Sequence, residues 1–224
     1  MYVRQDAWDT HADVVEAARR ATRWVHPVTN EVSAALSRDS QGVCAVASLD
    51  ALVRDLPEPS VGETLVVLAQ GRDPGNVGTI IRTADAFGAV GVIAVAGTVD
   101  ASSPKVVRAS VGSVFHIPVR VVPSFEEARA LVHGRGAALL GTSGGGGSVD
   151  LAQMFVQGVS ARSRLSQSHA WVFGNEAKGL SGDDMRLCDA LVSIPMSGDA
   201  ESLNVASAAA TCLFASQTVR GLHS

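Results

Sequence analysis

Lysine is scarce in this sequence: Lys105 and Lys178 are the only two, and arginine supplies the rest of the positive charge. The net charge over 224 residues is −4. That balance excludes a general electrostatic attraction to nucleic acid, so any such contact would have to use a local basic patch. Arginine suits that task, because its planar fork matches a phosphate better than an ammonium group does.

Cysteine is also rare. Cys44, Cys188 and Cys212 are far apart and form no C-x-x-C pair. This excludes a disulfide framework and a cysteine-based zinc site, and it is typical of a protein in the reducing cytoplasm. The six histidines include no H-x-x-x-H pair, so we expect no metal site.

Long apolar runs are missing as well. The N-terminus has no apolar segment of the signal-peptide type. Residues 202–219 carry no charge, but several serines, threonines and amides interrupt them, so a buried helix is expected there and a membrane span is not. We therefore predict a cytoplasmic protein without membrane contact.

Two segments are expected. Residues 1–57 should form a small α+β unit, with helices near 9–21 and 29–36 and a strand near 42–47, and Pro57, Pro59 and Gly62 mark its end. Such a unit is too small for a good core of its own. Residues 62–224 form the second segment.

The second segment alternates apolar runs with helical patterns. Expected strands cover residues 65–69, 91–96, 116–122, 137–141, 170–173 and 190–196. Expected helices cover residues 77–87, a stretch from 103, 124–133 and 202–220, and the polar residues 161–168 should be exposed. Continuous apolar strands between helices predict an α/β fold, a mostly parallel sheet flanked by helices.

Glycine-rich and polar loops follow the last two strands. In an open α/β sheet, ligands bind at this carboxyl edge. The glycine run at 144–147 does not fit G-x-G-x-x-G, and the sequence has no G-x-x-x-x-G-K or G-x-S-x-G motif. Ordinary dinucleotide, P-loop and serine-hydrolase sites are therefore disfavoured.

Polar residues near these loops allow two interpretations each. Asn76 is either an N-cap or a site residue; if its helix began earlier, Asn76 and Arg82 would differ by about 240° around the axis. Arg82 either pairs with Asp85 on the surface or acts on a substrate. Glu176 is either a solvated carboxylate or a site residue. Asn204 opens an apolar helix that Ser202 is able to cap.

Three separated motifs stand out: Asn76-Val77-Gly78 with Arg82, then Gly174-Asn175-Glu176-Ala177-Lys178-Gly179, then Ile194-Pro195-Met196 with Ser202-Leu203-Asn204-Val205. Together they resemble the motifs of the SpoU/TrmH family of RNA ribose 2′-O-methyltransferases. The resemblance covers roughly residues 62–220. It implies a SPOUT fold whose C-terminal part forms a trefoil knot, a feature that general folding rules would not predict.

The resemblance also implies a site, a cofactor and an assembly. The cofactor is S-adenosylmethionine, the substrate is RNA, and the active site forms in a homodimer. Arg82 would orient a phosphate and stabilise the incipient alkoxide, since a guanidinium stays protonated and is a poor general base. The implied catalytic residues are Asn76, Arg82, Glu176, Ser202 and Asn204, and the implied cofactor-binding residues are Thr142, Gly174, Asn175, Gly179, Ile194, Met196 and Leu203.

Substrate recognition is the least defined part. Residues 28–47 resemble only the last part of the RNA-binding domain that precedes the catalytic domain in many members, so residues 1–57 are interpreted as a shortened substrate-binding segment. Arg19, Arg20 and Arg23 form either a basic strip or a solvated helix face. Ribosomal RNA is favoured over transfer RNA. The alternatives are a non-catalytic RNA-binding or dimerising protein and a knotted methyltransferase that acts on a base.

Overall fold

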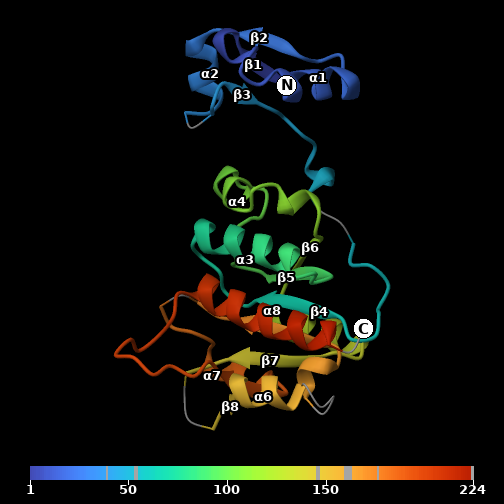
Figure 1. Ribbon diagram of the computed structural model, residues 1–224, viewed down its shortest axis with the longest axis vertical. Helices are drawn as coiled ribbons and strands as arrows, with labels where there is room; N and C mark the ends of the chain where they lie inside the picture. The colour runs from blue at the N-terminus through green and yellow to red at the C-terminus, as the bar shows by residue number, and fades with distance from the viewer. Residues whose placement is uncertain (39, 53–54, 145–146, 159–162, 176, 223–224) are drawn as a thin grey trace. The chain divides into compact units, whose positions relative to one another are not determined.

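The chain divides into two compact units, Met1–Ser48 and Leu49–Ser224. The computed structural model describes residues 1–38, 40–52, 55–144, 147–158, 163–175 and 177–222 (Figure 1). The division falls before the Pro57–Gly62 stretch at which the sequence places it. The intervening residues pack with the second unit: Leu52 belongs to its core, and the Pro57 carbonyl accepts a hydrogen bond of 2.8 Å from Arg135.

The first unit is a three-stranded sheet with two helices. The central strand β1 (Tyr2–Arg4) runs parallel to β2 (His26–Val28) and antiparallel to β3 (Val43–Cys44). The helices are α1 (Ala12–Ala21) and α2 (Asn30–Leu36), and Thr29 caps α2. The strand expected at 42–47 is only two residues long, and the left-handed φ of 94° at Gly42 precedes it.

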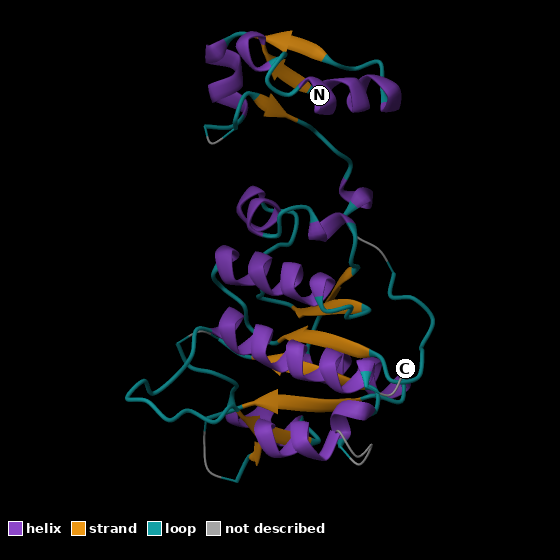
Figure 2. Cartoon of the chain, viewed as in Figure 1, coloured by secondary structure: helices purple, strands orange, loops and turns teal. Residues whose placement is uncertain are grey.

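A seven-stranded sheet forms the centre of the second unit, in the order β6-β5-β4-β9-β7-β10-β8. Every strand pair in it is parallel, which confirms the predicted mostly parallel α/β sheet. Figure 2 shows the strands between helices. The strands are β4 (Thr64–Leu68), β5 (Gly91–Val95), β6 (Val119–Val122), β7 (Ala138–Thr142), β8 (Val149–Asp150), β9 (His169–Phe173) and β10 (Ala190–Ser193).

Helices cover both faces of this sheet. On one face, apolar side chains of α3, α4, α6 and α8 share a core with Val66 and Leu68, while on the other face α5 and α7 pack near Leu65 and Val67. Alternate residues of β4 thus enter opposite cores, which explains its continuous apolar sequence. The helices are α3 (Pro74–Ala86), α4 (Pro104–Ala109), α5 (Phe125–Gly134), α6 (Leu151–Gly158), α7 (Gly182–Leu187) and α8 (Val205–Gly221).

Some details depart from the sequence-based expectations. The elements β8, α6 and α7 were not predicted. Residues 163–168 are not simply exposed: Ser163 and Leu165 are 2% and 0% exposed, and Leu165 joins the core beside α8. A single leucine anchors this otherwise polar stretch, and one residue produces no periodic signal.

Two buried polar groups lie at the amino ends of the sheet strands. Glu63, which precedes β4, accepts hydrogen bonds from Arg135 Nε and Nη2 at 2.6 and 2.8 Å. Burial would raise the pKa of Glu63, but hydrogen bonds from Arg135 and Ser60 hold it below its usual value. The side chains of Glu63 and Arg135 are 0% and 7% exposed. Because Arg135 also bonds the Pro57 carbonyl, this buried ion pair holds the residues before β4 against the sheet.

The second group is centred on His169, at the start of β9. Its Nε2 lies 2.7 Å from Ser216 Oγ, and Trp171 Nε1 donates to the same oxygen at 2.8 Å. His169 Nδ1 lies 2.8 Å from the Gln167 carbonyl, which only accepts. A neutral ring with its proton on Nδ1 satisfies both contacts. Burial lowers the pKa of His169 to about 4, and the charge of Arg220 adds to this.

Among the described helices, none has the length and apolar character that crossing a lipid bilayer requires. The trefoil knot that the resemblance implies stays a prediction.

Candidate functional site

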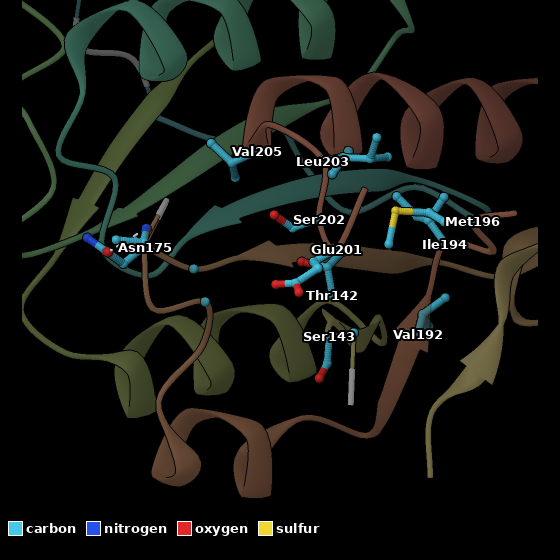
Figure 3. A pocket seen from close by; sticks show the side chains of 15 residues that line it. Thr142, Ser143, Asn175, Val192, Ile194, Met196, Glu201, Ser202, Leu203 and Val205 are labelled. Carbon is cyan, nitrogen blue, oxygen red and sulfur yellow. Dashed lines mark hydrogen bonds between the residues drawn. The ribbon is translucent and has the colours of Figure 1, made fainter. Parts of the chain in front are cut away.

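A cavity opens at the carboxyl edge of the sheet. It measures about 250 Å³, slightly less than the roughly 300–1,000 Å³ usual for small-molecule sites. The end of β7, the loop after β9, the end of β10 with its following loop, and the first turn of α8 all contribute to its wall (Figure 3). Its lining consists of Thr142, Ser143, Gly144, Gly174, Asn175, Ala177, Gly179, Val192, Ile194, Met196, Glu201, Ser202, Leu203, Val205 and Ala208.

All seven residues predicted to bind a cofactor lie in this lining. Ser202, predicted as catalytic, lines it too. Asn76, Arg82 and Asn204 do not, and Glu176 lies outside the described residues. The structure therefore brings together segments up to 61 residues apart in sequence, between 142 and 203, while the roles of these residues stay a prediction.

Gly174 and Gly179 close the loop after β9 on itself. Asn175 and Gly179 exchange main-chain hydrogen bonds of 2.9 and 2.8 Å, and Asn175 Oδ1 accepts from the N–H groups of Ala177 and Lys178. A Cβ at position 174 would lie 2.3 Å from the Gly179 carbonyl. The absence of a side chain at Gly174 therefore allows the close approach of the chain's own backbone at Gly179.

The hydroxyl group of Thr142 is used inside the protein. Its Oγ1 donates to the Val172 carbonyl at 2.9 Å, which ties the end of β7 to β9. The main chain at Ser143 is tied in the same way, because its N–H donates to Val192 at 3.0 Å. These bonds fix one wall of the cavity as a continuation of the sheet.

Asn76 and Asn204 lie in direct contact although 128 residues separate them. Asn204 Nδ2 donates to Asn76 Oδ1 at 3.0 Å. Asn204 Oδ1 accepts from the N–H groups of Ala206 and Ser207, which makes Asn204 the N-cap of α8. One amide thus caps α8 and joins its start to the start of α3.

Neither Asn76 nor Ser202 caps its helix, so the cap alternative for Asn76 and the expected cap at Ser202 were wrong. Asp73, not Asn76, caps α3, because its Oδ1 accepts the Asn76 N–H at 2.8 Å and Pro74 follows at the first helical position. Asn204, not Ser202, caps α8. Ser202 is consequently free of capping and faces the cavity.

Arg82 stands apart from this arrangement. It is exposed on α3, and no hydrogen bond or ion pair joins it to another residue in the described part of the chain. The surface pair with Asp85 does not form: Asp85 instead contacts His116 Nδ1 at 3.2 Å. Since α3 begins before Asn76, the rotation around the helix axis from Asn76 to Arg82 is about 240°, so the two side chains leave α3 on different sides.

Sequence reasoning missed Glu201, which the structure places in the cavity lining. Among the lining residues that the structure describes, it is the one side chain with a formal charge. Figure 3 shows its carboxylate among the other side chains of the cavity. Its position directly before Ser202 was a signal, because a motif that supplies one lining residue brings its neighbours close. Over the described ranges, no cluster of three or more His, Cys, Asp or Glu is placed to hold a metal ion.

Comparison with known proteins identifies a family over the same part of the chain. The model of the SpoU rRNA Methylase family matches residues 63–214. The chain is 36% identical over 208 residues to the 23S rRNA (guanosine-2′-O-)-methyltransferase RlmB of Bordetella pertussis, covering 90% of this chain and 81% of that protein. It is 40% identical over 154 residues to the 23S rRNA (uridine(2479)-2′-O)-methyltransferase of Streptomyces viridochromogenes, covering 66% and 50%.

A solved structure with bound cofactor agrees in fold. The AdoMet-bound rRNA methyltransferase from Sinorhizobium meliloti is 32% identical, with a TM-score of 0.72 over 97% of this chain and 79% of that one. The family model covers well over half of the sequence, and the relatives align across both units. The chain therefore belongs to the SpoU rRNA methylase family.

Proposed function

We propose that this protein transfers a methyl group from S-adenosylmethionine to a ribose 2′-oxygen of ribosomal RNA. The observation that carries the proposal is the convergence of two loops and a helix start on one cavity, in a chain of the SpoU family. Relatives named above are 23S rRNA 2′-O-methyltransferases, which favours ribosomal over transfer RNA as the substrate.

The residues present fit the cofactor. Val192, Ile194 and Leu203 offer apolar surface for a flat ring, while the glycines of the lining contribute only main-chain atoms. Glu201 adds a carboxylate for a cationic group. S-adenosylmethionine supplies an electrophilic methyl group on a positively charged sulfur. The tasks left to the protein are to position the ribose hydroxyl and to assist loss of its proton.

Arg82 is the residue that we propose for positioning the ribose and assisting the loss of its hydroxyl proton. Its guanidinium would bind an RNA phosphate and stabilise negative charge on the attacking oxygen, while Asn76, Glu176, Ser202 and Asn204 would hold the arginine and the amino-acid end of the cofactor. Asn76 and Asn204 are already joined by a hydrogen bond, which supports a shared role.

The active form is proposed to be a homodimer. Arg82 does not line the cavity of its own chain and points away from Asn76. A second copy that brings its Arg82 to this cavity would complete the site. In a doubly tagged dimer of one Arg82→Ala chain and one Asn204→Ala chain, one of the two shared sites keeps both residues. We expect about half of the wild-type rate per dimer; a mixed dimer as inactive as either parent would contradict shared sites.

The first unit is proposed to bind RNA. Residues 17–30 contain three arginines, His26 and Trp24 but no acidic residue. Trp24 is 61% exposed, and the Arg23 guanidinium lies 5.3 Å from its ring centre. Exposed aromatic rings beside arginine favour stacking with unpaired bases. We propose a cytoplasmic location, which an RNA substrate and three free cysteines support.

The test is methylation of transcribed 23S ribosomal RNA by the full chain with isotope-labelled cofactor, followed by mass mapping of the product. Methylated ribose supports the proposal. A methylated base would favour the base-directed alternative, and no incorporation would favour the non-catalytic one. Bulk transfer RNA serves as the competing substrate.

Arg82→Ala tests the assignment of that residue. We expect the single-turnover rate to fall roughly 100-fold or more, because a cation aimed at the developing charge is lost. Cofactor affinity should stay within about twofold, because the proposed partners of Arg82 are an RNA phosphate and the attacking oxygen, and neither is part of the cofactor. Arg186→Ala, which removes an exposed arginine of α7, is the matched control. Loss of binding and transfer together would overturn the assignment.

A further inference from the structure

Glu201 gives the cavity a charge that its other described residues do not have. The remaining lining residues that the structure describes are apolar, small or neutral polar, and they include no arginine, lysine or histidine. Within the described residues, no ion pair or hydrogen bond engages the Glu201 carboxylate. The charge is therefore available to whatever occupies the cavity.

The expected occupants differ in charge. Methyl transfer breaks the S–CH3 bond, leaves the electron pair on sulfur, forms the O–CH3 bond and releases the hydroxyl proton to solvent. The bound molecule thereby changes from S-adenosylmethionine, with net charge +1, to S-adenosylhomocysteine, with net charge zero. Its adenine, ribose and amino-acid end are unchanged.

Contacts to those unchanged parts cannot separate donor from product. Apolar contacts from Ile194 or Leu203 and main-chain contacts from Gly174 are the same for both molecules, apart from one methyl group. Only a group that senses charge makes a large difference, and among the described residues of the lining that group is Glu201. A cavity of about 250 Å³ is small enough that a bound sulfonium lies within the carboxylate's field.

We infer that Glu201 is a specificity-determining residue that makes the cavity prefer the cationic methyl donor over its neutral thioether product. The inference rests on the proposed function, because it takes the occupant to be S-adenosylmethionine. Its consequence is that the carboxylate attracts the cofactor before transfer and loses its electrostatic attraction to the same molecule afterwards. Product release is favoured without any movement of the protein.

The experiment measures dissociation constants by calorimetry for the full chain without RNA. Three ligands are compared: S-adenosylmethionine, S-adenosylhomocysteine, and sinefungin, which carries an ammonium-bearing carbon in place of the methylsulfonium. In Glu201→Gln we expect the preference for each cationic ligand over S-adenosylhomocysteine to fall roughly fivefold. Added salt should reduce the same preference in the wild type but not in this variant.

Two variants separate the local carboxylate from other effects. Asp199→Asn removes the same charge two residues away, at a position outside the lining, and should leave the preference near the wild-type value. Glu201→Asp keeps the charge and should retain most of the preference, which guards against a purely structural effect of Glu201→Gln.

The outcomes separate this inference from the proposed function. If all three ligands bind the wild type and Glu201→Gln leaves their ratio unchanged, the inference is overturned and the proposed function stands. If none of the three binds the wild type, both fail. An equal loss of affinity for charged and neutral ligands in Glu201→Gln would also overturn the inference, because it would show a general contact and no selectivity.

Discussion

The two edges of the seven-stranded sheet are built in opposite ways. At the amino ends of the strands, Glu63, Arg135 and His169 are buried, and each is held by hydrogen bonds of 2.6–2.8 Å. At the carboxyl ends, the chain leaves the sheet in glycine-rich loops around a cavity, and Glu201, Ser202 and Leu203 are exposed there. The polar groups at the amino edge bond within the protein, whereas these three residues at the carboxyl edge are accessible to a ligand.

From this difference we expect the amino edge to contribute to stability and the carboxyl edge to contribute to binding. Buried polar groups are costly unless every one is paired, so a change at the amino edge should be felt as lost stability. Exposed loop residues contribute little to the folded state, so a change at the carboxyl edge should be felt as lost binding. The following expectations test that division, beginning with the largest.

Arg135→Ala should cost about 3–5 kcal/mol of unfolding free energy, because it leaves the Glu63 carboxylate buried without its partner. Urea unfolding followed by circular dichroism measures this. Cofactor affinity, measured well below the melting temperature, should stay near the wild-type value. The double variant Glu63→Leu, Arg135→Met should regain most of the loss. A cost below about 1 kcal/mol, as for an exposed pair, would mean that the amino edge is not fixed by this interaction.

Acidification should lower the free energy of unfolding through His169, which lies at the same edge. Its pKa is about 4 in the folded protein and about 6.5 in the unfolded chain, so the unfolded chain takes up the proton first as the pH falls. The stability present above pH 6.5 is then lost as the pH falls toward 4, about 2 kcal/mol of it between pH 7 and pH 5.

Urea midpoints at half-unit pH steps measure this loss. The window above pH 5 avoids most of the carboxylates, which titrate lower. His169→Gln is the control, and the stability of this variant should change little with pH between pH 5 and pH 7. An equal slope in both proteins would assign the effect to other groups.

At the carboxyl edge, Gly174→Ala should reduce cofactor affinity by roughly tenfold or more, about 1.4 kcal/mol. The added Cβ would lie 2.3 Å from the main chain of Gly179, so the loop that Asn175 and Gly179 close must open. Calorimetric titration measures the affinity. Gly198→Ala, at a glycine with open space around it, is the matched control and should bind normally. Normal binding by Gly174→Ala would show that the closed loop is not needed.

Much of the fold could be predicted because its signals are local. The strands with continuous apolar sequence, such as β4 and β9, were found because both of their faces are buried. Helix starts near residues 29, 103 and 124 were predicted correctly, and in the structure Thr29, Ser103 and Ser124 cap these helices. Short elements such as β8 and α7 carry too few residues to show a period.

The site was predictable to the extent that its residues are grouped in motifs. Glycine and polar residues after β9 and β10 indicated the edge, and the resemblance named the residues. The choice between Ser202 and Asn204 as cap could not be made locally, because both residue types cap well. Asn204, the residue that caps α8, also donates a hydrogen bond to Asn76, which is 128 residues away in sequence. The amino-edge groups around Glu63 and His169 depend on similarly distant partners, and no sequence pattern marks them.

The contact between Asn76 and Asn204 has a consequence for the newborn chain. Asn76 leaves the ribosome 128 residues before its partner, and β4 likewise waits for β9 to cover one of its edges. Until β9 is made, β4 exposes an unpaired strand edge, and until α8 is made, the nascent protein has no finished cavity. Methyl transfer is thereby prevented before α8 has been synthesised and has closed the cavity.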